Sequence, residues 1–378
     1  MKYHNVTLLL ICAYSFAYSQ QTIVDTITHD GLDRQYILYV PGSYTPGTRA
    51  PLVLNFHGYG SNALEQMFYG DFRPIADTAG FLIVHPQGTL DLLGGTHWNV
   101  GWGASSVDDV GFTIALIDSL SAMYHIDPER IYSTGMSNGG FFSYKLACEL
   151  SERIAAIASV TGSMNINQTV TCAPEHPMPV MEIHGTADST VQYDGTFLFA
   201  SIESVLEYWV GFNACDTTPI VEQLEDTDPN DGCTVEHQRY PNGTLGAEVE
   251  HFKIINGGHT WPGSAFIIGV TNQDMDASQE IWRFFSRYDI NGLIDQTSAT
   301  VHETANPVRV YPNPASESFT IEHGSDLTAP FVLSTLQGQQ ILRGFISGNI
   351  QTIPIAGIAP GMYLLTIDDQ TVKLVVTE

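Results

Sequence analysis

Basic residues are scarce in this 378-residue chain, which has 14 lysines and arginines against 41 aspartates and glutamates and a formal net charge of −27. A surface this negative repels nucleic-acid phosphates and anionic lipid head groups. The sequence offers no basic patch that would overcome this repulsion. We therefore expect no nucleic-acid partner.

Long apolar runs are missing beyond the N-terminus, because no later stretch approaches the roughly 18 apolar residues of a membrane span. The exception follows Lys2, where an apolar run at 6–17 leads to the small residues of Ala17-Tyr18-Ser19. This order is typical of a cleaved secretory signal. We expect residues 1–19 to be a signal peptide and the mature protein to be secreted or cell-surface, without a membrane span.

Cysteine is also sparse, with five residues in the chain. Cys12 lies in the expected signal, where the bulky Ile11 before it disfavours the alternative of a lipid-attachment site. The other four are Cys148, Cys172, Cys215 and Cys233. In an oxidising compartment an even number indicates disulfides, and four cysteines allow three pairings. We favour the two local pairings, Cys148 with Cys172 and Cys215 with Cys233, over buried free thiols.

Residues 20–290 alternate strand-like and helix-like segments, starting with a hairpin. Continuous apolar runs, typical of strands buried on both faces, lie at 52–56, 81–84, 130–133, 154–160 and 179–183. The clearest helical pattern between them covers 108–124. This alternation predicts an α/β fold, an open and mainly parallel sheet with helices on both faces, whose ligands lie beyond the carboxyl ends of the strands.

The composition changes after Ile290. Residues 291–306 are small and polar and predict a linker. Residues 307–378 contain short, closely spaced strand-like runs separated by Gly, Pro, Asn and Asp, which predict a small all-β sandwich.

The sharpest local motif is Gly135-Met136-Ser137-Asn138-Gly139, between an expected strand and an apolar helix. A serine hydroxyl is a weak nucleophile, and it must project where a base and a carbonyl can both reach it. A sharp strand-to-helix turn does this, and glycines permit its strained backbone. Ser137 is therefore a candidate nucleophile, the alternative being a structural Gly-rich turn.

A serine nucleophile needs a base that is oriented by an acid, and in this fold the expected chain order is Ser, then Asp or Glu, then His. Asp188 follows the strand-like run 179–183, and His259 lies in a Gly-rich loop. We predict Asp188 as the acid and His259 as the base, with Asp194 as the alternative acid. Taken singly, the two residues could equally be a capping Asp and a surface His.

Hydrolysis of an ester also needs donors for the oxyanion. Phe56-His57-Gly58-Tyr59-Gly60 ends an early strand, where one backbone donor arises in this architecture. We assign the oxyanion hole to the backbone amides of Tyr59 and Asn138. We expect His57 to act as a hydrogen-bonded support rather than in catalysis.

Three tryptophans lie in Gly-rich loops, where flat apolar side chains suit a substrate pocket: Trp98, Trp102 and Trp261. The alternative is loop packing.

Metal and cofactor sites have little support in the sequence. Residues 226–232 resemble a calcium loop, but the glycine falls one place late and His237 replaces the closing glutamate. A solvated acidic turn is the better interpretation. We expect no metal and no cofactor.

Segments 54–60, 81–87, 107–112, 126–140, 184–188 and 257–263 together resemble the polyhydroxybutyrate depolymerase and feruloyl esterase group of α/β-hydrolases, related to carbohydrate esterase family one. The resemblance covers most of residues 30–288. It implies a secreted serine esterase with Ser137 as nucleophile, Asp188 as acid and His259 as base. Members cleave hydroxyalkanoate polyesters, feruloyl or acetyl esters of polysaccharides, or simple esters.

The tail segments 310–314, 336–338 and 361–364 resemble the C-terminal sorting domain that the type nine secretion system of Bacteroidetes recognises. The resemblance implies the secretion machinery as a partner. A carbohydrate-binding sandwich is disfavoured because the aromatic residues of the tail are scattered.

The sequence therefore predicts a carboxylic-ester hydrolase that works through an acyl-enzyme. Two rival hypotheses remain, a serine peptidase with the same triad and a non-catalytic glycan-binding secreted protein.

Overall fold

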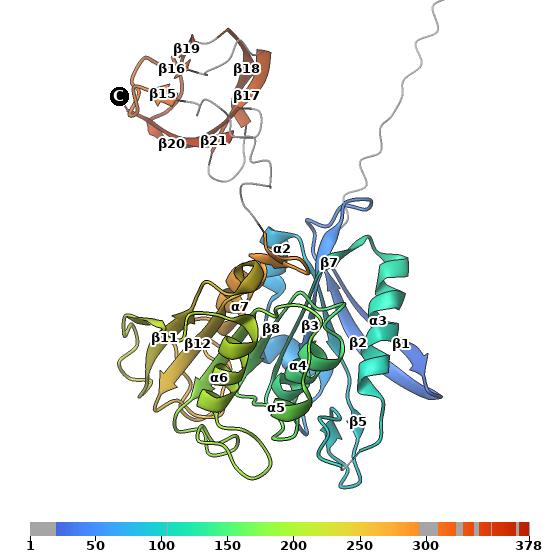
Figure 1. Ribbon diagram of the computed structural model, residues 1–378. Helices are drawn as coiled ribbons and strands as arrows, with labels where there is room; N and C mark the ends of the chain where they lie inside the picture. The colour runs from blue at the N-terminus through green and yellow to red at the C-terminus, as the bar shows by residue number, and fades with distance from the viewer. Residues whose placement is uncertain are drawn as a thin grey trace, which may run out of the picture. The chain divides into compact units, whose positions relative to one another are not determined.

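A computed structural model describes residues 20–103, 105–294, 309–322, 328–335, 340–348, 350–367 and 370–377 (Figure 1). The expected signal peptide at 1–19, the tail motif at 336–338 and most of the expected linker at 291–306 lie outside these residues. The chain divides into two compact units, with the division between Ile294 and Asp295. Among the residues described, no helix combines the length and apolar character that crossing a membrane requires.

The first unit is built on one twisted sheet whose central strands are parallel, as predicted (Figure 1). Antiparallel strands extend it at both edges. In spatial order the strands are β1 (Gln21–His29), β2 (Leu32–Val40), β4 (Leu82–Pro86), β3 (Ala50–Phe56), β7 (Ile126–Met136), β8 (Ala156–Val160), β9 (Val180–Gly185), β12 (Val249–Ile255), β11 (Thr234–Tyr240) and β10 (Ile220–Gln223).

Helices cover both faces of this sheet because its strands carry apolar side chains on both faces. One hydrophobic cluster joins the sheet to α3 (Asp109–Met123), α4 (Asn138–Glu149) and α6 (Ile202–Asn213). The cluster on the other face includes residues of α2 (Arg73–Ala79) and α7 (Ala277–Phe285). The remaining short elements are α1 (Ala63–Tyr69), α5 (Gln168–Thr171), the 3₁₀ turn Thr244–Gly246, and the strand pairs β5 (Thr89–Leu90) with β6 (Thr96–His97) and β13 (Tyr288–Asp289) with β14 (Gly292–Leu293).

The register of the parallel strands aligns their carboxyl ends at one edge. Phe56 at the end of β3 pairs with Gly135 in β7, and Met136 pairs with Val160 at the end of β8. Ile254 in β12 pairs with Gly185 at the end of β9. The loops that follow β3, β7, β9 and β12 therefore emerge side by side, although they are distant in sequence.

One disulfide occurs in the described part of the chain, between Cys148 and Cys172, with Cα atoms 4.8 Å apart. The predicted pairing of Cys215 with Cys233 is wrong, because both thiols are free and buried. Cys215 packs in the cluster that contains α6, whereas Cys233 packs in the cluster on the opposite face of the sheet. The local spacing could not reveal that the sheet separates them.

These two thiols are expected to be unreactive in the folded protein. Burial raises the pKa of Cys215 to about 11 and that of Cys233 to about 12, and the thiolate is the reactive form. In the protein lacking residues 1–19, a thiol reagent should label no cysteine before denaturation and two afterwards, or four after reduction as well. Mass spectrometry counts the labels, and a native protein with two fast-reacting thiols would contradict the buried placement.

The second unit, described by itself, contains two antiparallel sheets that enclose their own apolar cluster, as expected for a small sandwich. One sheet contains β15 (Arg309–Tyr311), β16 (Ser318–Glu322) and β19 (Ile350–Pro354). The other contains β18 (Gln340–Ser347), β17 (Thr328–Thr335), β20 (Gly361–Ile367) and β21 (Gln370–Val376). Phe319, Leu333 and Leu365 are among the residues that fill the space between them.

Candidate active site

Ser137 occupies a strained turn between β7 and α4, at the sheet edge where the loops converge. Its backbone has φ 53° and ψ −118°, in the region that L-residues rarely adopt. A Cβ atom at Gly135 would lie 2.5 Å from the carbonyl oxygen of Phe56, and a Cβ atom at Gly139 would clash with the same oxygen. Only glycine at these positions lets β7 and α4 close tightly against the end of β3.

Asp188 and His259 form a hydrogen bond beside this turn. His259 Nδ1 lies 2.7 Å from Asp188 Oδ2, while Asp188 Oδ1 accepts the backbone N–H groups of Thr190 and Val191 at 2.8 and 2.9 Å. The carboxylate is fully buried and the imidazole ring is one-fifth exposed. The alternative acid, Asp194, is exposed. The structure thus pairs His259 with Asp188.

The carbonyl of Gly257 holds the two loops together by accepting the N–H of Ala187 at 3.0 Å. Gly185 faces this carbonyl so closely that a Cβ atom there would clash with it. The position of the imidazole relative to the carboxylate is therefore set by the backbone.

The loop after β3 runs alongside Ser137. A Cβ atom at Gly58 would lie 3.4 Å from the Cβ atom of Ser137. The Tyr59 amide belongs to the peptide bond that directly follows Gly58. Asn138 is the first residue of α4, and the first N–H groups of a helix lack an intrahelical acceptor. Its side chain is held in place by hydrogen bonds with the backbone of Trp98, at 2.7 and 3.2 Å.

His57 supports this loop from below, as expected. Its Nε2 accepts the N–H of Gly88 at 2.9 Å, so the proton resides on Nδ1, which donates to the Gly58 carbonyl at 2.7 Å. Burial lowers the pKa of His57 from 6.5 to about 4. At pH 7 the ring is therefore uncharged, and its two hydrogen bonds hold the loop.

The lowered pKa of His57 predicts an acid-sensitive loop. Protonation removes the acceptor for Gly88, so the stabilisation by His57 is complete above about pH 6.5 and is lost as pH falls toward about 4. Denaturant unfolding measured from pH 8 to 4 should show a steeper loss of stability in the native protein than in a His57→Gln variant. Equal slopes would contradict this role.

A cavity of about 580 Å³ opens beside Ser137 and His259. Its wall is mainly apolar, formed by Tyr59, Leu64, Phe68, Tyr69, Met136, Phe266 and Ile268. Few polar side chains reach it, among them Glu65, whose carboxylate accepts a hydrogen bond from Ser61 at 2.7 Å. Phe266 and Ile268 are more than half exposed and sit in the loop that follows His259. The cavity can therefore receive an apolar group next to the serine.

A smaller cavity of about 250 Å³ is also lined by Tyr59. Trp102 lines it and is 42% exposed, packing edge-on against Phe141. Its lining also includes apolar residues such as Leu93 and Val100 and polar residues such as Asp91 and Asn99. The Tyr59 hydroxyl donates to Asp91 at 2.8 Å. Tyr59 thus lines both the mainly apolar cavity and the smaller one.

The two other tryptophans pack in the interior. Trp98 is 1% exposed at the base of the smaller cavity and donates to the carbonyl of His57 at 3.0 Å. Trp261 is also 1% exposed, lines neither cavity and donates to Ser278 at 3.2 Å. The expectation that Trp261 forms a pocket wall is therefore replaced by a packing role, because its indole is directed into the core.

The polar neighbours of Asp188 carried no sequence signal. Glu182 and His184, both fully buried in β9, are hydrogen-bonded to each other, and His184 Nε2 lies 3.5 Å from the Asp188 carboxylate. Their positions in a strand read as ordinary core positions, and only the fold brings them next to Asp188.

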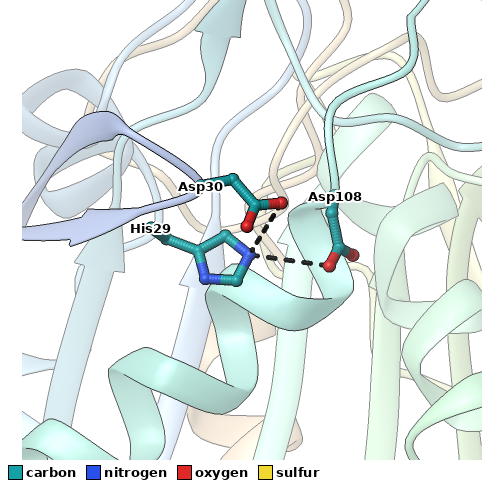
Figure 2. A group of neighbouring side chains, drawn as sticks. All are labelled: His29, Asp30 and Asp108. Carbon is teal, nitrogen blue, oxygen red and sulfur yellow. Dashed lines mark ion pairs between the residues drawn. The ribbon is translucent and has the colours of Figure 1, made fainter.

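One group of metal-ligating side chains occurs among the described residues, away from this site. Figure 2 shows His29 at the end of β1 with Asp30 and Asp108, and the ring Nε2 is 3.8 and 3.5 Å from their carboxylates. Both carboxylates are exposed, and Asp108 also caps α3 by accepting the Gly111 N–H. Exposed acidic groups at such spacing are common without a metal.

The acidic turn at 226–232 uses its carboxylates internally. Asp231 accepts the backbone N–H groups of Cys233 and Gln273, and Asp274 accepts those of Thr227 and Asp228.

Two parts of the chain match known protein families. Residues 34–196 match the family described as esterase PHB depolymerase, and residues 309–377 match the secretion system C-terminal sorting domain. The second match indicates that the protein is secreted or held at the cell surface.

Two curated relatives are similar to part of this chain. The bifunctional acetylxylan esterase/xylanase XynS20E of Neocallimastix patriciarum is 27% identical over 282 residues, which cover 72% of this chain and 36% of that protein. Feruloyl esterase B of Piromyces equi is 28% identical over 237 residues, which cover 60% of this chain and 42% of that protein. The chain thus spans less than half the length of either relative.

A solved structure, the acetyl xylan esterase from Aspergillus awamori, matches 71% of this chain and 99% of its own with a TM-score of 0.51 and 15% identity. This likeness shows that the first unit has the α/β-hydrolase fold. Within this chain, residues 34–196 are thus similar to the esterase PHB depolymerase family, and residues 309–377 to the secretion system C-terminal sorting domain.

Proposed function

We propose that the protein is a secreted serine esterase that hydrolyses carboxylic esters through an acyl-enzyme. Ser137 Oγ attacks the ester carbonyl while His259 Nε2 takes its proton, and the amides of Tyr59 and Asn138 bind the oxyanion. His259 then gives the proton to the departing alcohol. Water, deprotonated by His259, releases the acid from Ser137, and Asp188 holds the ring in the required tautomer throughout.

The observation that carries this proposal is the convergence of three loops on one cavity. The 2.7 Å bond to Asp188 leaves Nε2 of His259 as the proton acceptor, and His259 lines the same cavity as Ser137. Asp188 and His259 follow Ser137 in the chain order expected for this fold.

The cavities favour an ester with an apolar acid part. A volume of about 580 Å³ with an apolar wall suits a hydroxyalkanoate chain or an aromatic acid better than acetate. The exposed Trp102 and polar side chains of the smaller cavity suit a hydroxylated alcohol part. The names of the relatives and the family support esters of polysaccharides and polyhydroxybutyrate-type polyesters as the substrate classes.

We further propose that residues 1–19 direct export across the inner membrane and that the C-terminal unit is read by the type nine secretion machinery. The sorting-domain match at 309–377 supports the second step.

Substrate screening tests the function. The mature protein should hydrolyse feruloyl, acetyl-polysaccharide or hydroxybutyrate esters and leave peptides of matched length intact. Faster cleavage of peptides than of every ester would favour a serine peptidase, and binding to glycans without hydrolysis would favour a non-catalytic protein.

The apolar cavity predicts a selective effect of Phe68→Ala. Phe68 lines the cavity, and removing its ring deletes apolar contact with the acid part of the substrate. We expect kcat/KM to fall roughly 10- to 100-fold for a feruloyl or butyryl ester and little for an acetyl ester. Phe197→Ala is the matched control, because Phe197 is 86% exposed and lines neither cavity. Equal losses on both esters would contradict the assignment of this cavity to the acid part.

A further inference from the structure

A buried chain of polar side chains leads to Asp188 from inside the sheet. Glu182 Oε1 lies 2.9 Å from His184 Nδ1, and His184 Nε2 lies 3.5 Å from Asp188 Oδ2. All three side chains have no exposed surface. Tyr144 of α4 donates its hydroxyl to Glu182 Oε2 at 2.7 Å. Asp188, on which His259 depends, is therefore the end of a network rather than an isolated carboxylate.

The hydrogen bonds of His184 define its protonation state. Its Nδ1 faces a carboxylate oxygen, and its Nε2 faces the carbonyl oxygen of Val191 at 2.8 Å. The Val191 carbonyl only accepts, so Nε2 carries a proton. Burial raises the pKa of Glu182, but the Tyr144 hydroxyl also donates to this carboxylate, and an ionised Glu182 requires a second ring proton on Nδ1. Although burial alone would lower the pKa of His184, its hydrogen bond and charge interaction with Glu182 raise this pKa above 6.5.

The other titratable groups around the His184 ring do not provide the positive charge beside Asp188. The Tyr193 ring meets His184 edge-on, and His251 of β12 is neutral because burial lowers its pKa to about 4. Glu203 of α6 is occupied by the Tyr193 hydroxyl at 2.9 Å and by Lys253 at 3.2 Å. The imidazolium of His184 is thus the buried cation beside Asp188.

We infer that His184, held as an imidazolium by Glu182, is a positioning residue that keeps Asp188 directed toward His259. The inference rests on the proposed esterase function. The positive end of the Glu182–His184 pair faces Asp188, which stabilises a carboxylate that has no access to water. The same charge lies next to the Asp188–His259 pair and repels a positive charge on the His259 ring.

The test is the pH profile of a Glu182→Gln variant. The glutamine amide can donate to Nδ1, which leaves His184 neutral while its shape and packing are kept. We expect kcat/KM to fall roughly 10-fold and its acid limb to move up by about one pH unit, because the opposing charge is gone. A purely structural role would lower stability and leave the acid limb in place, and that result would overturn the inference.

Glu250→Gln is the matched control. Glu250 is an equally buried glutamate on β12, where it pairs with Arg283 and Arg287 outside the candidate active site. The same chemical change there should cost stability and leave the acid limb unchanged. A shift as large as that of Glu182→Gln would show a general effect of lost charge and would overturn the inference.

Nitrogen NMR of the ¹⁵N-histidine-labelled native protein decides the protonation state if Glu182→Gln does not fold. We expect the signals of His184 at pH 7 to be those of a ring protonated on both nitrogens, and a neutral tautomer would overturn the inference. The two hypotheses fail separately. A native enzyme that hydrolyses esters but has a neutral His184 refutes only this inference, whereas a native protein without hydrolysis refutes the proposed function.

Discussion

A Ser137→Ala variant is expected to lose ester hydrolysis by roughly 10⁴- to 10⁶-fold in kcat while remaining folded. Without the hydroxyl no acyl-enzyme can form, and the residual rate would come from water activated by His259 beside the oxyanion donors. Alanine is isosteric with serine except for that oxygen, and the strained turn is set by glycines at 135 and 139. Hydrolysis of a short aryl ester and the thermal unfolding midpoint measure the two effects.

Ser286→Ala serves as the control for this variant. The Ser286 hydroxyl donates to the carbonyl of Arg283 at the end of α7 and lines neither cavity. This variant should keep the native rate. A Ser137→Ala protein that keeps more than about a tenth of the native kcat would remove the acyl-enzyme mechanism.

An Asp188→Asn variant is expected to lose roughly 10⁴-fold in kcat. Its side-chain oxygen can still accept the N–H groups of Thr190 and Val191, so the loop should keep its shape. Its NH₂ group would replace Oδ2 and donate to Nδ1 of His259. The ring proton would then sit on Nε2, where the proton of Ser137 must be accepted.

Asp194→Asn is the comparison, because Asp194 is the other aspartate of this loop that the sequence offered. Its carboxylate is exposed, so we expect less than a threefold change in kcat. Measured with the same aryl ester, a large loss for Asp194→Asn and a small one for Asp188→Asn would reverse the assignment of the acid.

The parallel sheet could be predicted because its strands are apolar on both faces. The runs at 52–56 and 179–183 leave no polar face, and the observed β3 and β9 are buried along their whole length. The antiparallel edge strand β10 was not predicted. Its residues are all exposed, so burial had left no pattern in its sequence.

The order Ser137, Asp188, His259 could be read from the sequence because each residue follows a strand, and carboxyl ends of parallel strands share an edge. The sequence did not reveal which loop residues are buried and which are exposed. Trp102 and Trp261 both lie in Gly-rich loops, yet one is exposed at a cavity and the other is in the core. Which face of the sheet receives Cys215 or Cys233 likewise depends on packing.

The most direct test of the central claim is covalent labelling of the native protein with a fluorophosphonate, followed by peptide mapping. An activated serine should react at pH 7.5, with the added mass on the peptide that contains Ser137 and no added mass in the Ser137→Ala variant. A folded protein that remains unlabelled, or that carries the label on a different serine, would contradict the proposed active site.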